Sequence, residues 1–202
     1  MKIKNLYFSP VKSLSFNDVD NLEIIKNIGI KNDRIFAFTN NLNFKEIEFI
    51  KNNPLKREIY KFLSLKKYPE LNQYNFLLED NFLILELENK MILKTDIDNQ
   101  HEVKILCSKL EDMLPNINNI NLIKDSMNPF FDTMPNKSIS LINLNSIHDF
   151  ENLSNHKIEY ERFRGNIYVE DLDKWEERKL VGKVLSINGI KFKVVKDRKS
   201  VV

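Results

Sequence analysis

The chain has 202 residues and a formal net charge of +2, and its basic and acidic residues are interspersed, which gives no electrostatic case for nucleic-acid binding. No run approaches the ~18 apolar residues needed to span a bilayer, and the single cysteine, Cys107, excludes an internal disulfide. We therefore expect a cytoplasmic protein without a membrane or nucleic-acid partner, folded as one large domain or two small ones.

The first third of the chain predicts strands joined by turns. Lys2 to Phe8 alternates polar and apolar residues, which places Ile3, Leu6 and Phe8 on the inward face. Val19 to Ile25 and Arg34 to Thr39 are further strand candidates.

The middle of the chain predicts one short helix and then an antiparallel meander. Pro54 to Leu63 begins with proline at the favoured first helical position, and four apolar residues share one helical face: Leu55, Ile59, Phe62 and Leu63. Three apolar runs follow, separated by hairpin-like turns: Tyr74 to Leu78, Phe82 to Leu87 and Met91 to Leu93. These runs predict a small sheet or barrel.

A second helix and a connection follow the meander. Apolar residues between Val103 and Leu114 recur at helical spacing, and Asp98 or Asn99 is suited to cap the helix. The stretch from Asn116 to Asn128 is polar, rich in asparagine and bounded by prolines, so we interpret it as an inter-domain connection.

The last third again predicts mostly strands. Ser138 to Ile142 is a strand candidate, and Ser146 to Leu153 predicts a short helix capped by Asn145 or Ser146. Further strands are expected at Ile158 to Tyr160, Ile167 to Glu170, Val184 to Ile187 and Lys191 to Val195, with Asn188-Gly189 as a hairpin turn. The pattern predicts a β-rich α+β fold.

Generic motifs give no function. There is no phosphate-binding loop, dinucleotide fingerprint or metalloprotease motif, and the three histidines lack metal-ligand spacing. Cys107 follows Leu106 in a helical pattern, which favours a buried, inert thiol. The acidic cluster around Trp175 is typical of a solvated loop. No metal ligand and no catalytic residue is identified on these grounds.

Several sequence segments nevertheless resemble, in their order and spacing, the motifs of one protein family. They are Phe8 to Leu14, Gly29 to Phe36, Lys51 to Pro54, Ser138 to Ile147, Arg162 to Ile167, Trp175 to Gly182 and Val184 to Ile187. Together they resemble MOSC-domain proteins that carry an N-terminal MOSC-associated β-barrel, and they are similar to the amidoxime-reducing proteins of that family. Gly165 stands where the family's Arg-Phe-Arg-Pro-Asn-Ile phrase has proline.

The resemblance implies a fold and a division of the chain. It implies an α+β protein with an N-terminal β-barrel domain at 1–97, a helical connection at 98–130 and a MOSC β-barrel domain at 131–202 that lacks its C-terminal part. In the family a cysteine that ligates molybdenum follows the strand matching Lys191 to Val195. No cysteine occurs in the residues 196–202 of this chain, so we expect a truncated or degenerate homologue.

The resemblance also implies a cofactor site. Molybdopterin carries a phosphate and a polar pterin, which arginine and lysine side chains suit. The residues implied to hold it are Lys12, Ser13, Arg34, Arg164 and Asn166, with Ser140 and Ser146 near the pterin and Arg198 as a further cation. The alternative interpretation is that these are ordinary turn and strand-end residues.

Two functions stay open at this point. The first is an oxidoreductase that uses Mo-molybdopterin to reduce N-hydroxylated small molecules, with electrons from a redox partner protein. The second is a non-catalytic homologue that binds a pterin or another phosphorylated ligand, or that has lost cofactor binding, because neither lysine nor serine replaces a thiolate on molybdenum. The resemblance also implies pyridoxal phosphate binding, which is associated with the family.

Overall fold

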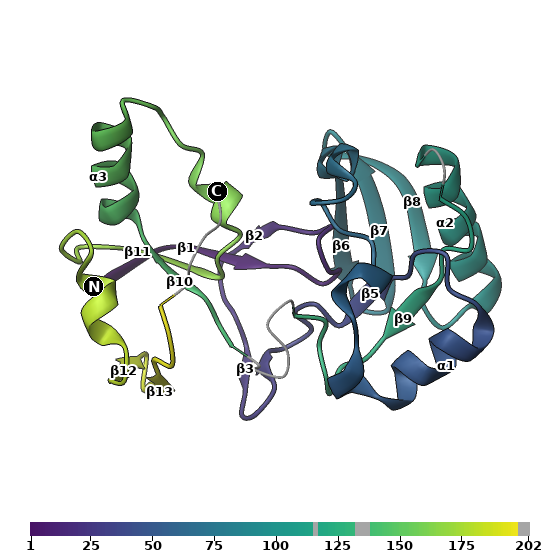
Figure 1. Cartoon of the computed structure of the whole chain (residues 1–202), viewed down its shortest axis with the longest axis horizontal. Coiled ribbons are helices and arrows are strands. Elements are labelled where there is room, and N and C mark those ends of the chain that lie inside the picture. Colours follow the sequence, from purple (N-terminus) through teal and green to yellow (C-terminus); the bar gives the residue numbers. More distant parts are fainter. Residues whose placement is uncertain (115–116, 132–137, 198–202) are drawn as a thin grey trace. The chain divides into compact units, whose positions relative to one another are not determined.

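The computed structural model describes residues 1–114, 117–131 and 138–197, and the chain divides into two compact units (Figure 1). Unit 1 comprises Met1–Tyr7, Asp18–Asn21 and Ile139–Val202, and unit 2 comprises Phe8–Asn17 and Leu22–Ser138. Each unit is discontinuous in sequence, because the N-terminal strand belongs with the last third of the chain. The segment 98–130, expected as a connection, lies within unit 2.

The fold is α+β, as the sequence predicts. The strands form one four-stranded sheet, one three-stranded sheet and three two-stranded pairs. None of these sheets closes into a barrel among the described residues, so the expected barrels are not observed there.

Unit 1 is built on the four-stranded sheet, whose strand order is β10-β11-β1-β2. Its strands are β10 (Leu141–Asn143), β11 (Ile167–Glu170), β1 (Lys2–Phe8) and β2 (Asn17–Val19). β1 is antiparallel to β11, and β10 is parallel to β11. The strand predictions at both ends of the chain are therefore confirmed, but their pairing is long-range.

The predicted inward face of β1 is confirmed only in part, since Ile3 is half-buried between the exposed Lys2 and Lys4. Tyr7 is buried, whereas Ile3, Leu6 and Phe8 are only half-buried. The register of β1 against β11 shifts between Ile3 and Asn5, and such a bulge changes which residues share a face. Simple alternation therefore holds only on one side of the irregularity.

A helix and a hairpin complete unit 1. Helix α3 (Leu144–Ser154) begins at Asn143, whose side chain accepts a hydrogen bond from the Asn145 N–H, so the cap is neither of the two predicted residues. The strand predicted at 158–160 is absent; the chain there leads into a 3₁₀ turn, η4 (Tyr160–Phe163). A second 3₁₀ turn, η5 (Glu176–Leu180), precedes the hairpin of β12 (Val184–Ile187) and β13 (Ile190–Lys193).

Unit 2 contains the predicted meander. Strands β6 (Tyr74–Glu79), β7 (Phe82–Leu87) and β8 (Lys90–Asp96) are antiparallel neighbours. Two short pairs accompany them: β3 (Ile24–Ile25) with β4 (Gly29–Ile30), and β5 (Phe36–Phe38) with β9 (Leu122–Lys124). The predicted strands at 19–25 and 34–39 thus form, but only in short pieces.

The predicted helix at 54–63 is wrong, and a helix lies just before it. Helix α1 (Phe44–Asn52) begins at Asn43, which forms a reciprocal capping box with Glu46. The chain after Pro54 makes only two single 3₁₀ turns, η1 (Pro54–Lys56) and η2 (Ile59–Lys61). Proline ends α1 rather than starting a new helix, because the residue before a proline is pushed out of the helical region.

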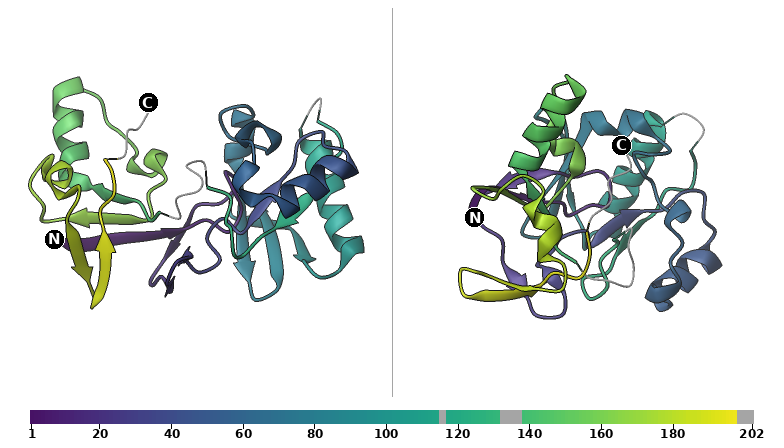
Figure 2. Two further views of the ribbon diagram at one scale, coloured as in Figure 1. Left: turned by 60° about the horizontal axis from the view of Figure 1, so that its bottom comes forward. Right: turned by 60° about the vertical axis from the view of Figure 1, so that its left-hand side comes forward.

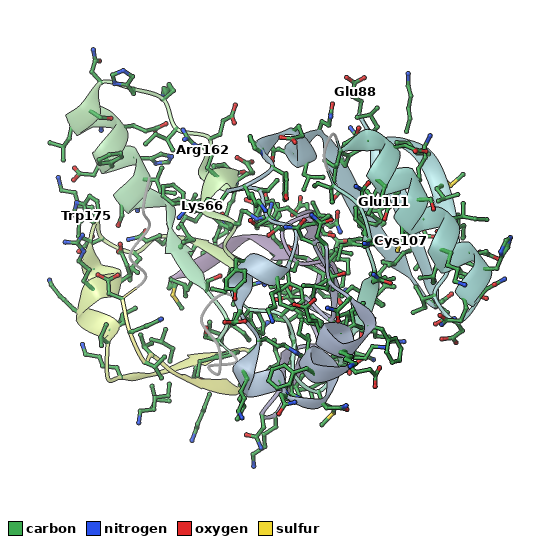
Figure 3. All side chains as sticks on the ribbon, turned by 45° about the vertical axis from the view of Figure 1, so that its right-hand side comes forward. Lys66, Glu88, Cys107, Glu111, Arg162 and Trp175 are labelled. Carbon is green, nitrogen blue, oxygen red and sulfur yellow. The ribbon has the colours of Figure 1, made fainter. Side chains whose placement is uncertain are left out.

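Helix α2 (Gln100–Met113) covers the core of unit 2. It is capped by Asn99, one of the two predicted residues, and buries Leu106, Cys107 and Leu110. Figure 3 labels Cys107 on this helix. It contacts β8, and a third short 3₁₀ element, η3 (Pro69–Gln73), contributes Leu71 to the same core cluster.

The segment interpreted as an inter-domain connection is part of the core instead. Within 117–128, three isoleucines are buried, Ile117, Ile120 and Ile123, and β9 pairs with β5. The asparagines between them mask this pattern in the sequence, because single isoleucines separated by polar residues do not reach the density of a strand signal.

One buried hydroxyl of the meander generates a stability prediction. Thr95 is fully buried, and its Oγ1 has no hydrogen-bond partner among the residues that the structure describes. Thr95→Val keeps the shape and removes the unpaired hydroxyl, so we expect a gain of about 1 kcal/mol in the free energy of unfolding, measured by urea denaturation. The control is Thr39→Val: Thr39 is equally buried, but its Oγ1 accepts from the Asn121 N–H at 3.0 Å, so that substitution is expected to destabilise. Equal effects at both positions would contradict the prediction.

A second prediction concerns Gly165, which precedes β11. A Cβ at this position would lie 2.5 Å from Ile142 Cγ1 and 3.3 Å from Tyr168 Cε2, so no side chain fits. Gly165→Ala is expected to destabilise the protein by about 1–3 kcal/mol, measured by thermal or urea unfolding.

The double variant Gly165→Ala/Ile142→Ala identifies the cause. If the clash with Ile142 is responsible, the double variant loses less stability than the sum of the two single variants. Additive losses would show that another contact is involved.

Candidate functional site

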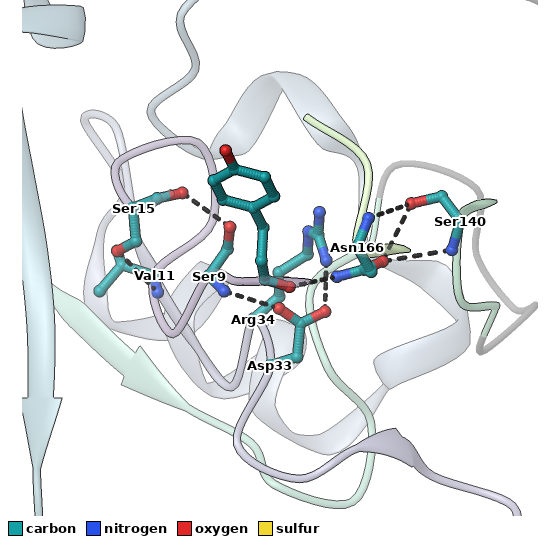
Figure 4. A network of polar contacts seen from close by, with 8 residues as sticks. Ser9, Val11, Ser15, Asp33, Arg34, Ser140 and Asn166 are labelled. Carbon is teal, nitrogen blue, oxygen red and sulfur yellow. Dashed lines mark hydrogen bonds and ion pairs between the residues drawn. The ribbon is translucent and has the colours of Figure 1, made fainter. Parts of the chain in front are cut away.

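The loop that carries Lys12 and Ser13 is closed by its own serines. Ser9 Oγ donates to the Ser15 carbonyl at 2.7 Å, and the Val11 N–H donates to Ser15 Oγ at 3.2 Å (Figure 4). Ser13 lies at the tip with φ of 65°, in the left-handed region. These bonds give the loop a single tight path, so Lys12 is presented from a rigid backbone.

The carboxylate of Asp33 ties this loop to the next segment. Its Oδ1 accepts from the Ser9 N–H at 2.9 Å, and its Oδ2 is paired with Arg34 Nη1 (Figure 4). The Asp33 side chain is only 2% exposed and that of Arg34 is 16% exposed. A buried carboxylate is stable only when it is hydrogen-bonded and paired, and here both oxygens are satisfied.

Backbone pairing continues from that point. The Phe36 N–H donates to the Pro10 carbonyl at 3.0 Å, and the Lys12 N–H donates to the Phe36 carbonyl at 2.8 Å. The Arg34 carbonyl accepts from the Phe130 N–H at 2.8 Å, and the Arg34 guanidinium lies 5.2 Å from the ring centre of Phe131. Lys12 and Arg34 are therefore brought together with the Phe130-Phe131 segment inside unit 2.

A depression opens beside this segment. Its enclosed space is about 10 Å³, and its lining residues are Lys12, Arg57, Ile59, Phe62, Phe130 and Phe131. A space of that size is close to the minimum for one water molecule, so the depression is a shallow contact surface and does not enclose a ligand. We call it the Lys12 depression.

Arg57 is the residue of this site that the sequence interpretation missed. Its Nε donates to the Ile50 carbonyl at 3.2 Å and its Nη1 to the Asn128 carbonyl at 2.6 Å, while Nη2 is paired with Asp125. Its guanidinium carbon lies 4.4 Å from the ring centre of Phe130. Each of its nitrogens is engaged by the protein, so Arg57 shapes the wall of the depression. In the predicted helix Arg57 fell on the polar side, and no sequence signal pointed to burial.

The predicted residues of unit 1 form a separate group. Asn166 Oδ1 accepts from the N–H and the Oγ of Ser140, at 3.2 and 3.0 Å, and Asn166 Nδ2 donates to the Tyr7 carbonyl at 3.3 Å (Figure 4). Asn166 is 2% exposed. These bonds hold the end of β1 and the start of β10 to β11, which is a structural use of both side chains.

Ser146 and Arg164 also have local surroundings within unit 1. Ser146 Oγ donates to Glu177 Oε2 at 2.9 Å and accepts from the Trp175 N–H at 2.8 Å, so it clamps the acidic loop to α3. Arg164 is half-buried and left-handed, with φ of 48°, at the end of η4. Arg198 lies outside the described residues.

The predicted site residues therefore fall into two groups. Lys12, Ser13 and Arg34 belong to unit 2. The residues from the last third, namely Ser140, Ser146, Arg164 and Asn166, belong to unit 1. As cofactor-binding residues they stay predictions. Within unit 2, Lys12 lines the Lys12 depression, and Arg34 stacks on Phe131, another of its lining residues.

The only thiol of the chain does not suit metal ligation. Cys107 is buried on α2, and burial raises the pKa of its thiol to about 11. A ligand to a soft metal has to be a thiolate, which this environment disfavours. Across residues 1–114, 117–131 and 138–197, no group of three or more histidine, cysteine, aspartate or glutamate side chains is placed to hold a metal ion.

Comparisons with known proteins give no related protein for this site. No family model matches the chain, and neither the curated proteins nor the solved structures contain a significant match. In the part of the chain that the structure describes, no helix has the length and apolarity needed to cross a membrane.

The Asp33–Arg34 pair generates a prediction about stability. Asp33→Asn keeps the shape of the side chain and removes the charge that pairs with Arg34, so we expect a loss of about 3 kcal/mol in the free energy of unfolding. Glu23→Gln is the control, because Glu23 pairs with Lys31 at 2.7 Å on the exposed surface and such a pair contributes at most about 1 kcal/mol. The free energy of unfolding of both variants is measured by urea denaturation. Similar small losses in the two would show that the buried pair contributes little to stability.

A further prediction concerns Cys107. Because its pKa is raised in the folded state, folding favours the neutral thiol; this contribution is complete below the ordinary pKa of a cysteine and is lost as the pH rises toward about 11. We therefore expect unfolding stability to fall in that alkaline range by less in Cys107→Ala than in the unchanged protein. Alkylation of the native thiol at neutral pH should be slow and should become fast in denaturant, and rapid native labelling would contradict the burial.

Proposed function

We propose that the chain is a MOSC-like binding protein for a phosphorylated pterin of the molybdopterin class, with the phosphate end of the ligand at the Lys12 depression. The proposal follows the second of the two functions that the sequence leaves open. We also propose, as the resemblance implies, that the protein is cytoplasmic and that its two domains are related to β-barrel domains.

The observation that supports it is the position of Lys12. This lysine is 5% exposed and lines the depression with three phenylalanine rings, and Arg34 stacks on one of them. An ammonium group at an apolar, partly enclosed surface attracts a phosphate more strongly than one in bulk water, because the effective dielectric constant is lower.

The cations around the depression differ in their printed contacts. Arg34 is paired with Asp33 and stacks on Phe131, and Arg57 is paired with Asp125. Lys12 is the third cation, and the proposal assigns the contact with the ligand phosphate to its ammonium group. The aromatic rings offer faces on which a flat heterocycle can stack.

Molybdenum bound through a protein thiolate does not fit the residues of this chain. The single cysteine is the buried Cys107, and its raised pKa keeps the thiol protonated at neutral pH. We therefore derive no reaction step through the metal. The molybdenum-dependent oxidoreductase with an N-hydroxylated substrate and a redox partner is a distinct hypothesis, which the metal content of the purified protein tests.

The experiment is a fluorescence titration with the stable oxidised form of molybdopterin and with the same pterin lacking its phosphate. We expect the unchanged protein to bind the phosphorylated form more tightly. Lys12→Met, which keeps the apolar stem and removes the charge, is expected to weaken binding of the phosphorylated form by roughly tenfold, the equivalent of one charged hydrogen bond.

The control variant is Lys45→Met, which removes an exposed lysine on α1 and leaves the net charge equal to that of Lys12→Met. Thermal unfolding of both variants establishes that they fold. Equal affinity of the two variants for the phosphorylated pterin, or no preference for the phosphorylated form, would overturn the proposal.

A further inference from the structure

The hairpin of β12 and β13 is closed by a two-residue turn whose sequence, Asn-Gly, is chemically reactive (Figure 2). Ile187 pairs with Ile190, so Asn188 and Gly189 alone form the turn. Both residues have positive φ, 48° and 78°, as a type I′ turn requires. An asparagine side chain thus directly precedes a glycine N–H, which is the least hindered amide nitrogen that a protein offers.

The turn is open on all sides. Asn188 and Gly189 are both exposed, and a Cβ placed on Gly189 would meet no atom within 4 Å. No hydrogen bond joins the Asn188 side chain to another residue that the structure describes. The amide group is therefore free to rotate toward the backbone.

The hairpin can also open locally. It is a two-stranded sheet with no third strand among the described residues, and isolated two-stranded hairpins are marginally stable in water. Fraying of its turn costs little free energy, so Asn188 reaches backbone conformations that the closed turn excludes.

The charge on the hairpin favours loss of a proton from the backbone. Its two strands and turn contain no aspartate or glutamate, whereas Lys191 and Lys193 lie on β13 and Lys183 directly precedes β12. Positive charge nearby stabilises the anionic form of an amide nitrogen, which is the form that attacks a carbonyl carbon.

We propose that Asn188 is a site of spontaneous covalent modification, in which its side chain loses ammonia through an imide formed with Gly189. The Gly189 nitrogen, deprotonated by base, bonds to Asn188 Cγ, and the Cγ–Nδ2 bond breaks as ammonia leaves with a proton. Water then opens the five-membered imide at either carbonyl and leaves an aspartyl or an isoaspartyl residue. The sum consumes one water, releases one ammonia and involves no oxidation or reduction.

The product changes the hairpin in two ways. A carboxylate enters a stretch that otherwise has none, and the isoaspartyl form adds a methylene to the main chain of a turn that accommodates only two residues. The extra atom disturbs the pairing of Ile187 with Ile190, so modification loosens the hairpin with time. This inference is independent of the pterin proposal.

The test is peptide mapping by mass spectrometry after incubation of the intact protein in mildly alkaline buffer. Asn89 is the internal control: it is exposed, has φ of 61° in the turn between β7 and β8, and is followed by lysine rather than glycine. We expect Asn188 to lose its amide under conditions in which Asn89 retains it, with isoaspartate among the products.

A variant checks the route. Gly189→Ala crowds the attacking nitrogen and is expected to slow the loss at position 188, and amide hydrogen exchange of β12 and β13 shows whether the hairpin stays paired. Equal rates at Asn188 and Asn89, or a product that is aspartate without isoaspartate, would overturn the proposal, because only the imide yields both.

Discussion

The buried carboxylate of Asp33 is the constraint on which the candidate site depends. One oxygen receives the Ser9 N–H and the other pairs with Arg34, so two segments that are 24 residues apart in sequence are held at one point. The backbone pairing of Lys12 with Phe36 and of Arg34 with Phe130 follows from that attachment. A charge this deeply buried needs both partners, so the loop, its lysine and the aromatic segment have one common arrangement.

Residue type alone does not separate binding residues from structural ones here. Arg57 lines the depression, yet two of its nitrogens donate to backbone carbonyls and the third is paired with the Asp125 carboxylate. Asn166 and Ser140 similarly satisfy each other within unit 1. A polar side chain whose donors are already used stabilises the fold, and replacing those bonds by bonds to a ligand brings little net free energy.

Local patterns were predictable where the interacting residues are close in sequence. The meander of β6, β7 and β8, the Asn99 cap of α2 and the Asn188-Gly189 turn follow from alternation, capping and turn chemistry. The capping box of Asn43 and Glu46 was also present in the sequence and would have indicated α1. Lys12 and Arg34 were identifiable as site candidates from the family resemblance, but Arg57 was not.

The sequence by itself determined the α+β class, the hairpins and the chemistry available near Lys12, because each depends on neighbouring residues and on residue type. Only the tertiary structure decided that β1 pairs with β11, that the asparagine-rich stretch buries isoleucines beside β5, and that Arg57 lies under Phe130. These choices depend on contacts between segments far apart in the chain. Burial of apolar surface and pairing of buried charges select among them, and neither quantity can be obtained from a local stretch of sequence.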